Sequence, residues 1–377
     1  MAIELLFQLM KEKNASDMFL AVNSAVHLKV NGKLVPINTH KLEQGDIRSL
    51  LSEVCTPQQI MLLDRDNELN IGIPMPSLGR FRLSAFRQRG SISAVFRYVQ
   101  GNIPKLDELG LPAVLTELIM EKRGLILVAG AAGSGKSTTI ASMLDYRNDS
   151  RTGHILTLED PIEYLFKNQL SIVNQREIGT DVVDFHTALR NSMRQAPDCI
   201  VIGEIREQET MAAALSYAQS GNLVLATLHA NNSYNALHRI VSFYPPENRA
   251  ALLQDLGSTV KAIISQRLVQ TIDGASRKAA VEVMINTLYI SDLIEKGDIA
   301  EVKEAIEKSL SPGSQTFEMA LLQLVKDGAI SQEEALANAD SATNLLWLLN
   351  NAPNGKNVQP EARRPEEASF TAFTLNT

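Results

Sequence analysis

The stretch from Gly130 to Ser137 fits the phosphate-loop pattern GxxxxGK[ST] and carries the clearest chemistry in the chain. Glycines let backbone N–H groups wrap a phosphate, a lysine there reaches the β- and γ-phosphates, and the last hydroxyl can bind Mg²⁺. The alternative interpretation is a glycine turn between two core elements, which requires no ligand. The pattern predicts a nucleotide site formed by Ala131, Ala132, Gly133, Ser134, Gly135, Lys136, Ser137 and Thr138.

Three carboxylates follow a second apolar run in the order Leu158-Glu159-Asp160-Pro161-Ile162-Glu163. Ligands of open α/β sheets bind at the carboxyl ends of the strands, where these acids are expected to lie. One acid in a phosphoryl-transfer site must orient or deprotonate the attacking water, and others help to hold the metal. A solvated acidic turn closed by proline is the alternative.

Two further runs end in polar residues. Residues 198–204 read DCIVIGE and deliver Glu204 at a strand end, where a carboxylate can serve the Mg²⁺ shell, often through water. Residues 227–230 read TLHA and place His229 beside the same edge, where a neutral imidazole can sense a γ-phosphate or orient a carboxylate. A strand-capping glutamate and a structural histidine are the alternatives.

Five arginines and no carboxylate occur between Gly79 and Val99. A solvated strand face is the simplest interpretation. The sharper hypothesis is that some of these arginines reach the nucleotide of a neighbouring subunit, because an arginine supplied in trans stabilises transition-state charge. Nucleic-acid binding is a weaker hypothesis, since alternation along the strand turns at least Phe81 inward.

The elements that position these residues alternate as a parallel sheet with crossovers requires. The expected strands are 125–129, 154–158, 199–203 and 223–227, and a helix is expected over 138–144. We therefore predict an α/β fold. Its expected units are an N-terminal α/β domain (1–100) with hairpins at Asn31-Gly32 and Arg89-Gly90, a linker (101–112), a phosphate-loop core (113–290), a helical C-terminal subdomain (291–350) and a disordered or partner-dependent tail (351–377).

Composition limits the class of protein. The chain has 377 residues, a net charge of −7 and two cysteines, Cys55 and Cys199, far apart in sequence. The acidic balance argues against a general nucleic-acid binder, and the cysteines provide no disulfide framework or metal spacing. The sequence shows no signal peptide and no apolar run of about 20 residues, so we expect a cytoplasmic protein without direct membrane insertion.

The motifs together resemble the secretion-superfamily hexameric ATPases, and most resemble the PilT/PilU group that retracts type IV pili. The resemblance is carried by GAAGSGKST, LEDPIEY, VNQREIG, DCIVIGEIR and TLHANN, in that order and spacing. The group's N-terminal PAS-like domain is resembled by three short stretches: Ala15-Ser16-Asp17, Val30-Asn31-Gly32-Lys33 and Gly79-Arg80-Phe81-Arg82. A later segment of the group resembles Gln266-Arg267-Leu268.

The resemblance implies a PAS-like domain followed by a RecA-like phosphate-loop ATPase domain with a helical C-terminal extension. It implies that Lys136, Ser137 and the loop hold ATP and Mg²⁺, that Glu163 activates water, and that Glu204 serves the metal. His229 would lie in the histidine box, and Arg82 and Arg97 would point at the adjoining protomer's nucleotide. The implied assembly is a homo-hexamer in the cytoplasm, docked on a platform protein at the inner-membrane base of the pilus machine.

Three features depart from the PilT pattern, and the last two of them suggest an accessory role. Ala131-Ala132 replaces the usual Pro-Thr at variable loop positions, so binding should survive. The segment 289–296, YISDLIEK, stands where PilT carries AIRNLIRE, and the chain has a longer tail. We therefore expect a PilU-like ATPase that acts with a PilT-like partner. The alternative is a nucleotide-binding adaptor that couples a partner ring to the pilus machine without needing its own turnover.

Overall fold

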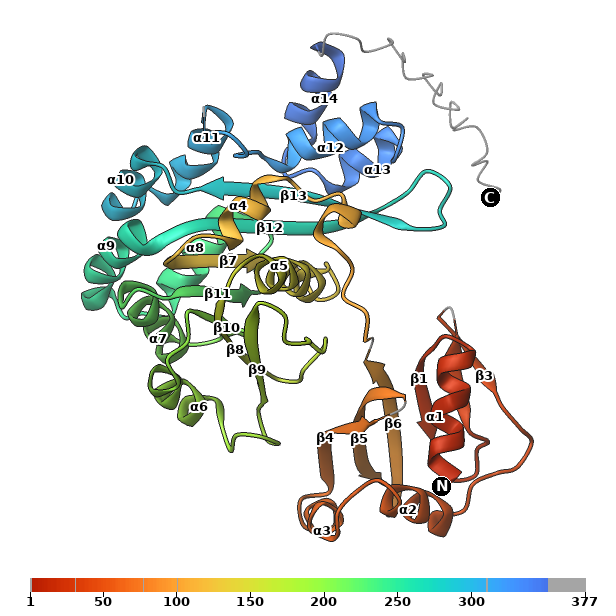
Figure 1. Ribbon diagram of the computed structural model, residues 1–377. Coiled ribbons are helices and arrows are strands. Elements are labelled where there is room, and N and C mark those ends of the chain that lie inside the picture. Colours follow the sequence, from red (N-terminus) through yellow and green to blue (C-terminus); the bar gives the residue numbers. More distant parts are fainter. Residues whose placement is uncertain (1, 31, 77, 100, 310, 352–377) are drawn as a thin grey trace, which may run out of the picture.

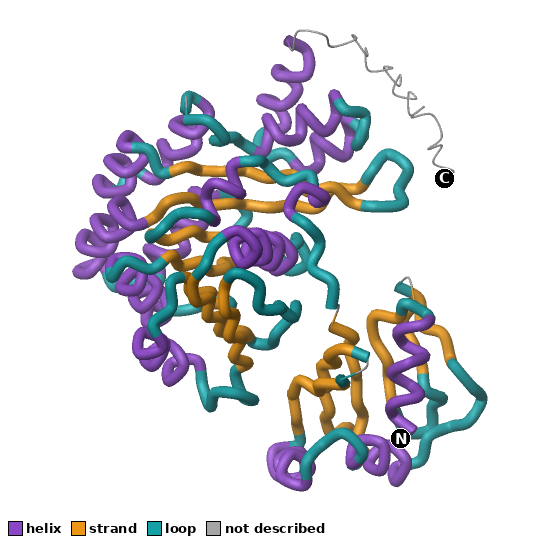
Figure 2. Tube along the Cα trace, viewed as in Figure 1, coloured by secondary structure: helices purple, strands orange, loops and turns teal. Residues whose placement is uncertain are grey.

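The computed structural model describes residues 2–30, 32–76, 78–99, 101–309 and 311–351. Two α/β units follow one another along the chain, and Figure 2 shows their strands as two separate groups joined by a loop. The expected tail lies almost entirely outside the described residues.

The N-terminal unit is a six-stranded antiparallel sheet covered by helices on one face, with strand order β3-β2-β1-β6-β5-β4. Its strands are β1 (Ala15–Leu20), β2 (His27–Val30), β3 (Lys33–Pro36), β4 (Glu68–Met75), β5 (Gly79–Gln88) and β6 (Ser91–Val99). Its helices are α1 (Ala2–Glu12), α2 (Gln44–Ser52) and α3 (Pro57–Asp66). Both predicted hairpins are present: β2 pairs with β3, and β5 with β6.

Alternation along β5 separates a core face from an arginine face. Phe81 is fully buried, as predicted, and its ring stacks on Phe7 of α1 with centroids 3.9 Å apart. Arg80 and Arg82 project from the opposite face because successive side chains of a strand alternate. The helices therefore cover the aromatic face and leave the arginine face free to meet other parts of the molecule.

The second unit is a seven-stranded sheet with the order β13-β12-β7-β11-β10-β8-β9. Every pair is parallel except β12 with β13. The strands are β7 (Gly124–Ala129), β8 (Gly153–Glu159), β9 (Ser171–Glu177), β10 (Cys199–Ile202), β11 (Leu223–Leu228), β12 (Val260–Gln270) and β13 (Arg277–Ile285). The four predicted strands are present, whereas β9, β12, β13 and the N-terminal β4 were not predicted.

Helices cover both faces of this sheet, as its apolar strands require (Figure 1). Along β7, Leu125 and Leu127 join the cluster on one face, while Ile126 and Val128 join the cluster on the other. The helices are α4 (Val114–Ile119), α5 (Lys136–Ser150), α6 (Phe185–Ser192), α7 (Gln208–Gln219), α8 (Ser233–Ser242), α9 (Arg249–Thr259) and α10 (Leu288–Lys296). Short 3-10 turns occupy Leu106–Leu109, Met193–Gln195, Pro246–Asn248 and Ile299–Glu301.

The C-terminal helices divide between two cores. Residues of α10 and α11, such as Ile290 and Val302, pack into one of the two clusters of the seven-stranded sheet. Phe317 and Leu345 instead form a small cluster with Val269 at the far end of β12. The four helices after α10 are α11 (Val302–Glu307), α12 (Phe317–Lys326), α13 (Gln332–Asn338) and α14 (Ala342–Asn351). The last three of them contribute residues to this small cluster, whereas α11 does not.

Candidate active site

The loop between β7 and α5 needs its glycines. Gly130 has a φ of +156°, and a Cβ there would lie 2.3 Å from the Ser134 Oγ atom. Gly135 has a φ of +92°, and its Cβ would lie 2.7 Å from Gln266 Nε2 on β12. Gln266 also accepts a 2.7 Å hydrogen bond from Thr139 in the first turn of α5. The tight loop therefore places the N-terminus of a 15-residue helix at the end of β7, which favours anion binding.

Lys136 folds back onto this loop. Its Nζ donates to the carbonyls of Gly130 and Ala131 at 2.8 and 2.9 Å. Burial lowers the pKa of Lys136, and the nearby carboxylates of Glu204 and Glu163 act in the opposite direction. The ammonium thus has no carboxylate bonded to it among the described residues and can exchange carbonyl partners for phosphate oxygens.

Ser134 supplies an independent sign of a missing ligand. Its hydroxyl is buried and has no hydrogen-bond partner in the described part of the chain. Buried hydroxyls are normally paired, because leaving one unpaired costs roughly 1–3 kcal/mol. A phosphate in the loop would provide the acceptor that Ser134 lacks.

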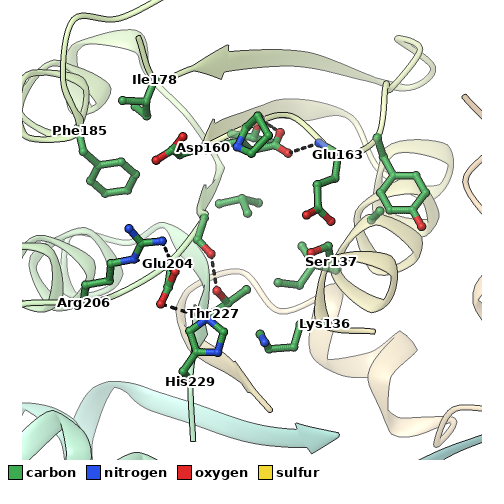
Figure 3. A pocket seen from close by; sticks show the side chains of 18 of the residues that line it. Lys136, Ser137, Asp160, Glu163, Ile178, Phe185, Glu204, Arg206, Thr227 and His229 are labelled. Atoms are coloured by element: carbon green, nitrogen blue, oxygen red, sulfur yellow. Dashed lines mark hydrogen bonds and ion pairs between the residues drawn. The ribbon is translucent and has the colours of Figure 1, made fainter. Parts of the chain in front are cut away.

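The acids after β8 occupy two different environments. Glu159 is held inside the fold, where Thr157 donates to it at 2.6 Å and Gln175 at 3.0 Å, and burial raises its pKa. Glu163 is exposed, and Figure 3 shows its carboxylate directed toward Ser137. Both glutamates line the cavity, but Glu163 is the more exposed, whereas Glu159 is half-buried and already accepts two side-chain hydrogen bonds.

A second carboxylate faces the loop from the strand ends beside β7. Glu204 follows β10 and His229 follows β11, and His229 Nε2 lies 3.3 Å from Glu204 Oε1. Arg206 pairs with the other oxygen of Glu204 at 2.7 Å. The backbone below is fixed by Thr227, whose hydroxyl donates to the Gly203 carbonyl. Neighbouring parallel strands therefore bring both predicted residues to one edge of the sheet.

These groups line one cavity of about 440 Å³. Figure 3 shows Glu163, Ser137 and Lys136 on one side of it and Glu204 with His229 on the other. The predicted residues that line it are Ala132, Gly133, Lys136, Ser137, Glu163, Glu204 and His229. Ala131, Ser134, Gly135 and Thr138 belong to the loop without lining the cavity, and Thr138 instead shares a 2.8 Å hydrogen bond with the Tyr164 hydroxyl.

Arg82 and Arg97 lie outside this cavity, in the N-terminal domain. They are cross-strand neighbours on β5 and β6. The Nε of Arg97 donates to Asp17 at 2.7 Å, although 63% of its side chain remains exposed. Arg82 forms no ion pair within the described residues. A role in trans for either arginine stays a prediction.

A family model and a similar protein, each aligned with most of the chain, identify the family. The model of the family described as Type II/IV secretion system protein matches residues 2–338. The chain belongs to this family. It is 46% identical over 349 residues to the type IV pilus ATPase PilU of Pseudomonas aeruginosa, spanning 93% of this chain and 91% of PilU.

Further relatives agree with the predicted PilT/PilU-type resemblance, which is confirmed. The P. aeruginosa retraction ATPase PilT is 38% identical over 328 residues, or 87% of this chain and 95% of PilT. A crystal structure of the pilus retraction motor PilT with bound ADP superposes with a TM-score of 0.84 at 37% identity, over 90% of this chain and 97% of that one. The ATPase DotB of Legionella pneumophila reaches 0.78 at 27% identity, over 88% and 93% of the two chains. The predicted α/β fold is confirmed as well.

Sequence reasoning missed part of the cavity wall. Tyr164, Phe166, Ile178 and Phe185 form an apolar section of it, and Arg206 a basic one. Tyr164 and Arg206 were within reach, since both follow the predicted acids by one or two residues. The other three come from loops and a helix whose positions depend on β9, which was not predicted.

Two absences concern the described residues alone. No helix among them combines the length and apolar character that a membrane crossing requires. They also contain no cluster of three or more histidine, cysteine or acidic residues that could by itself hold a metal ion.

Proposed function

We propose that the chain is a Mg²⁺-dependent ATPase subunit that assists type IV pilus retraction. A single observation carries the proposal: the phosphate loop and two carboxylates, Glu163 and Glu204, line one cavity, and both carboxylates lie close enough to act on the charge of Lys136. The identity to PilU and PilT supports the assignment to the pilus machine.

The residues divide the chemistry among themselves. Lys136 and the loop N–H groups bind the β- and γ-phosphates, and the Ser134 hydroxyl gains its acceptor there. Glu163 accepts the hydrogen bond of the attacking water and takes its proton as the bond from the water oxygen to the γ-phosphorus forms. The bond between that phosphorus and the oxygen bridging to the β-phosphate breaks in the same step, and ADP leaves. His229 keeps one oxygen of Glu204 oriented toward the cavity.

The donor set fits Mg²⁺. Ser137 and Glu204 both line the cavity and offer a hydroxyl and a carboxylate oxygen, the hard ligands that this ion prefers. Bound there with the nucleotide, Mg²⁺ would neutralise charge that develops on the phosphate oxygens.

We further propose a homo-hexamer in which Arg82 and Arg97 complete the neighbouring subunit's site. Hydrolysis around the ring would move the N-terminal domains against the ATPase domains. In the cell the ring would lie in the cytoplasm against an inner-membrane platform protein of the pilus. The altered segment 289–296 and the higher identity to PilU than to PilT favour action beside a PilT-like ATPase.

One experiment tests assembly and catalysis together. The purified full chain is sized by light scattering with and without ATP and Mg²⁺, while phosphate release is followed. We expect ATP to favour a six-fold mass and phosphate to be released continuously. A chain that binds ATP but releases no phosphate, with or without a PilT-like partner, would contradict the proposal.

The alternative adaptor function is favoured by the same altered segment. Its test is pilus retraction in cells that carry Lys136→Ala together with an intact PilT-like ATPase. Full retraction would support coupling without turnover. Loss of retraction would support a motor, provided that the variant still associates with its partner.

A further inference from the structure

One arginine of the N-terminal domain crosses to the ATPase domain of the same chain. Arg80 Nη2 lies 2.8 Å from Glu177 Oε2, and the two side chains are 13% and 3% exposed. Arg80 belongs to β5, and Glu177 ends β9. A pair this buried costs solvation on both sides, so breaking it by removing one partner is far from neutral.

The same carboxylate holds the loop that follows β8 and carries Glu163, which we call the acidic box (residues 159–164). Glu177 Oε2 accepts the backbone N–H of Ile162 at 3.1 Å, and its Oε1 accepts the Thr180 hydroxyl at 3.1 Å. Ile162 is buried and immediately precedes Glu163. One oxygen atom thus joins the N-terminal domain to the peptide that carries the cavity-facing glutamate.

A glycine makes room for the contact. A Cβ at Gly72 on β4 would lie 2.2 Å from Arg80 Nη2 and 2.7 Å from Glu177 Oε1. Glycine inside a strand commonly marks such a close approach. Gly72 lies directly across from Arg82, so Arg80 passes diagonally over β4 to reach Glu177.

The rest of the loop is attached to the same strand. Gln175 Nε2 donates to the Tyr164 carbonyl at 2.7 Å, and the N–H of Ile178 donates to the Glu159 carbonyl at 2.9 Å. Hydrogen bonds therefore attach both ends of the acidic box to the end of β9, so a shift of β9 should shift the box with it. Among these links, Arg80 is the one that comes from the other domain.

We propose that Arg80 is a positioning residue that acts through Glu177 to hold Glu163 at the cavity. The position of the N-terminal domain would then set the geometry of water attack in its own subunit. This is distinct from the proposed role of Arg82 and Arg97, which reach a neighbouring subunit. The inference rests on the proposed function of Glu163.

The test uses four variants of the full chain. Arg80→Gln removes the cation, Arg80→Lys retains one, and Gly72→Ala inserts a methyl group without changing any charge. Gly45→Ala is the matched control, because a Cβ at Gly45 meets nothing within 4 Å. Thermal unfolding identifies any variant that fails to fold.

The first measurement needs no ATP turnover. Amide hydrogen exchange of residues 159–166 reports the Ile162 N–H bond directly. We expect faster exchange there in Arg80→Gln and Gly72→Ala, with Gly45→Ala like the wild type. Unchanged exchange in Arg80→Gln would overturn the inference.

The second measurement separates positioning from binding. We expect kcat for phosphate release to fall about tenfold in Arg80→Gln and Gly72→Ala while KM for ATP stays near the wild-type value. Arg80→Lys should recover part of the turnover. Faster exchange with an unchanged kcat would overturn the positioning role. A wild-type chain without ATPase activity, or a fully active Glu163→Gln, would instead overturn the proposed function.

Discussion

Replacing Lys136 by methionine removes one buried ammonium and keeps a side chain of similar length. Within the described part of the chain, this ammonium donates to the Gly130 and Ala131 carbonyls. A hydrogen bond to a charged group contributes roughly 1.5–3 kcal/mol. At about 1.4 kcal/mol per factor of ten, Lys136→Met should weaken ADP binding about 10- to 150-fold.

Calorimetric titration with ADP measures this loss. Lys122→Met is the control, because Lys122 is exposed and precedes the opposite end of β7. We expect the control to bind as the wild type does. An affinity of Lys136→Met within about twofold of wild type would refute the assigned phosphate contact, since even the weakest charged hydrogen bond exceeds that difference.

The pH dependence gives a second check on the same lysine. Burial lowers the pKa of Lys136 in the free protein, whereas a bound polyphosphate favours the charged form. Affinity for ADP should therefore be full below that lowered pKa and fall about tenfold per pH unit above it. The loss should begin at a lower pH than an ordinary lysine would give, and it should be absent in Lys136→Met.

Three further predictions concern the core, a buried acid and the proposed trans contact. Phe81→Ala should cost the N-terminal domain about 3–5 kcal/mol in urea unfolding, whereas exposed Leu5→Ala should change it by less than about 0.5. Burial raises the pKa of Glu282, so its charged form destabilises the folded protein at neutral pH. Glu282→Gln should therefore raise the melting temperature at neutral pH, and the gain should vanish below the ordinary glutamate pKa. An equal gain at pH 3 would contradict this. Inactive Arg82→Ala or Arg97→Ala rings mixed with inactive Glu163→Gln rings should regain ATPase activity, and no recovery after subunit exchange would count against a trans role.

The convergence of Glu204 and His229 on the phosphate loop was predictable because each of these residues follows an apolar run. Parallel strands bring their carboxyl ends to one edge, so Glu204 and His229 had to lie near the phosphate loop once their strands were assigned. The type of residue then limits the chemistry. The family resemblance already named Glu163 as the residue that activates water. The structure adds that Glu159 is the more buried of the two, which the spacing of the acids does not show.

The unpredicted strands carry polar side chains for reasons that are tertiary. β9 lies at the sheet edge and holds Gln175 and Glu177, which bind the loop of the acidic box. Gln266 and Arg267 interrupt the apolar pattern of β12, although the strand itself continues through them. Gln266 accepts a hydrogen bond from Thr139 of α5. Arg267 stacks on Phe317, with its guanidinium carbon 3.9 Å from the ring centroid. An apolar-run criterion cannot recognise strands whose side chains serve such contacts.

The arginines of the second hairpin show the same limit. They look alike in sequence, yet Arg80 pairs with Glu177, Arg87 with Asp64 and Arg97 with Asp17. The partner of Arg80 lies 97 residues away, and no local pattern identifies it. Packing within the N-terminal domain assigns the partners of Arg87 and Arg97, and the packing of the two domains assigns the partner of Arg80.

The most direct measurement of the central claim is a rapid-mix assay of phosphate release by Glu163→Gln under single-turnover conditions. We expect Glu163→Gln to bind ATP as the wild type does and to release phosphate about 10²- to 10⁴-fold more slowly, because a positioned base usually contributes that much. Release at the wild-type rate would show that this carboxylate, which lies in the cavity on the same side as Ser137 and Lys136, does not activate the attacking water.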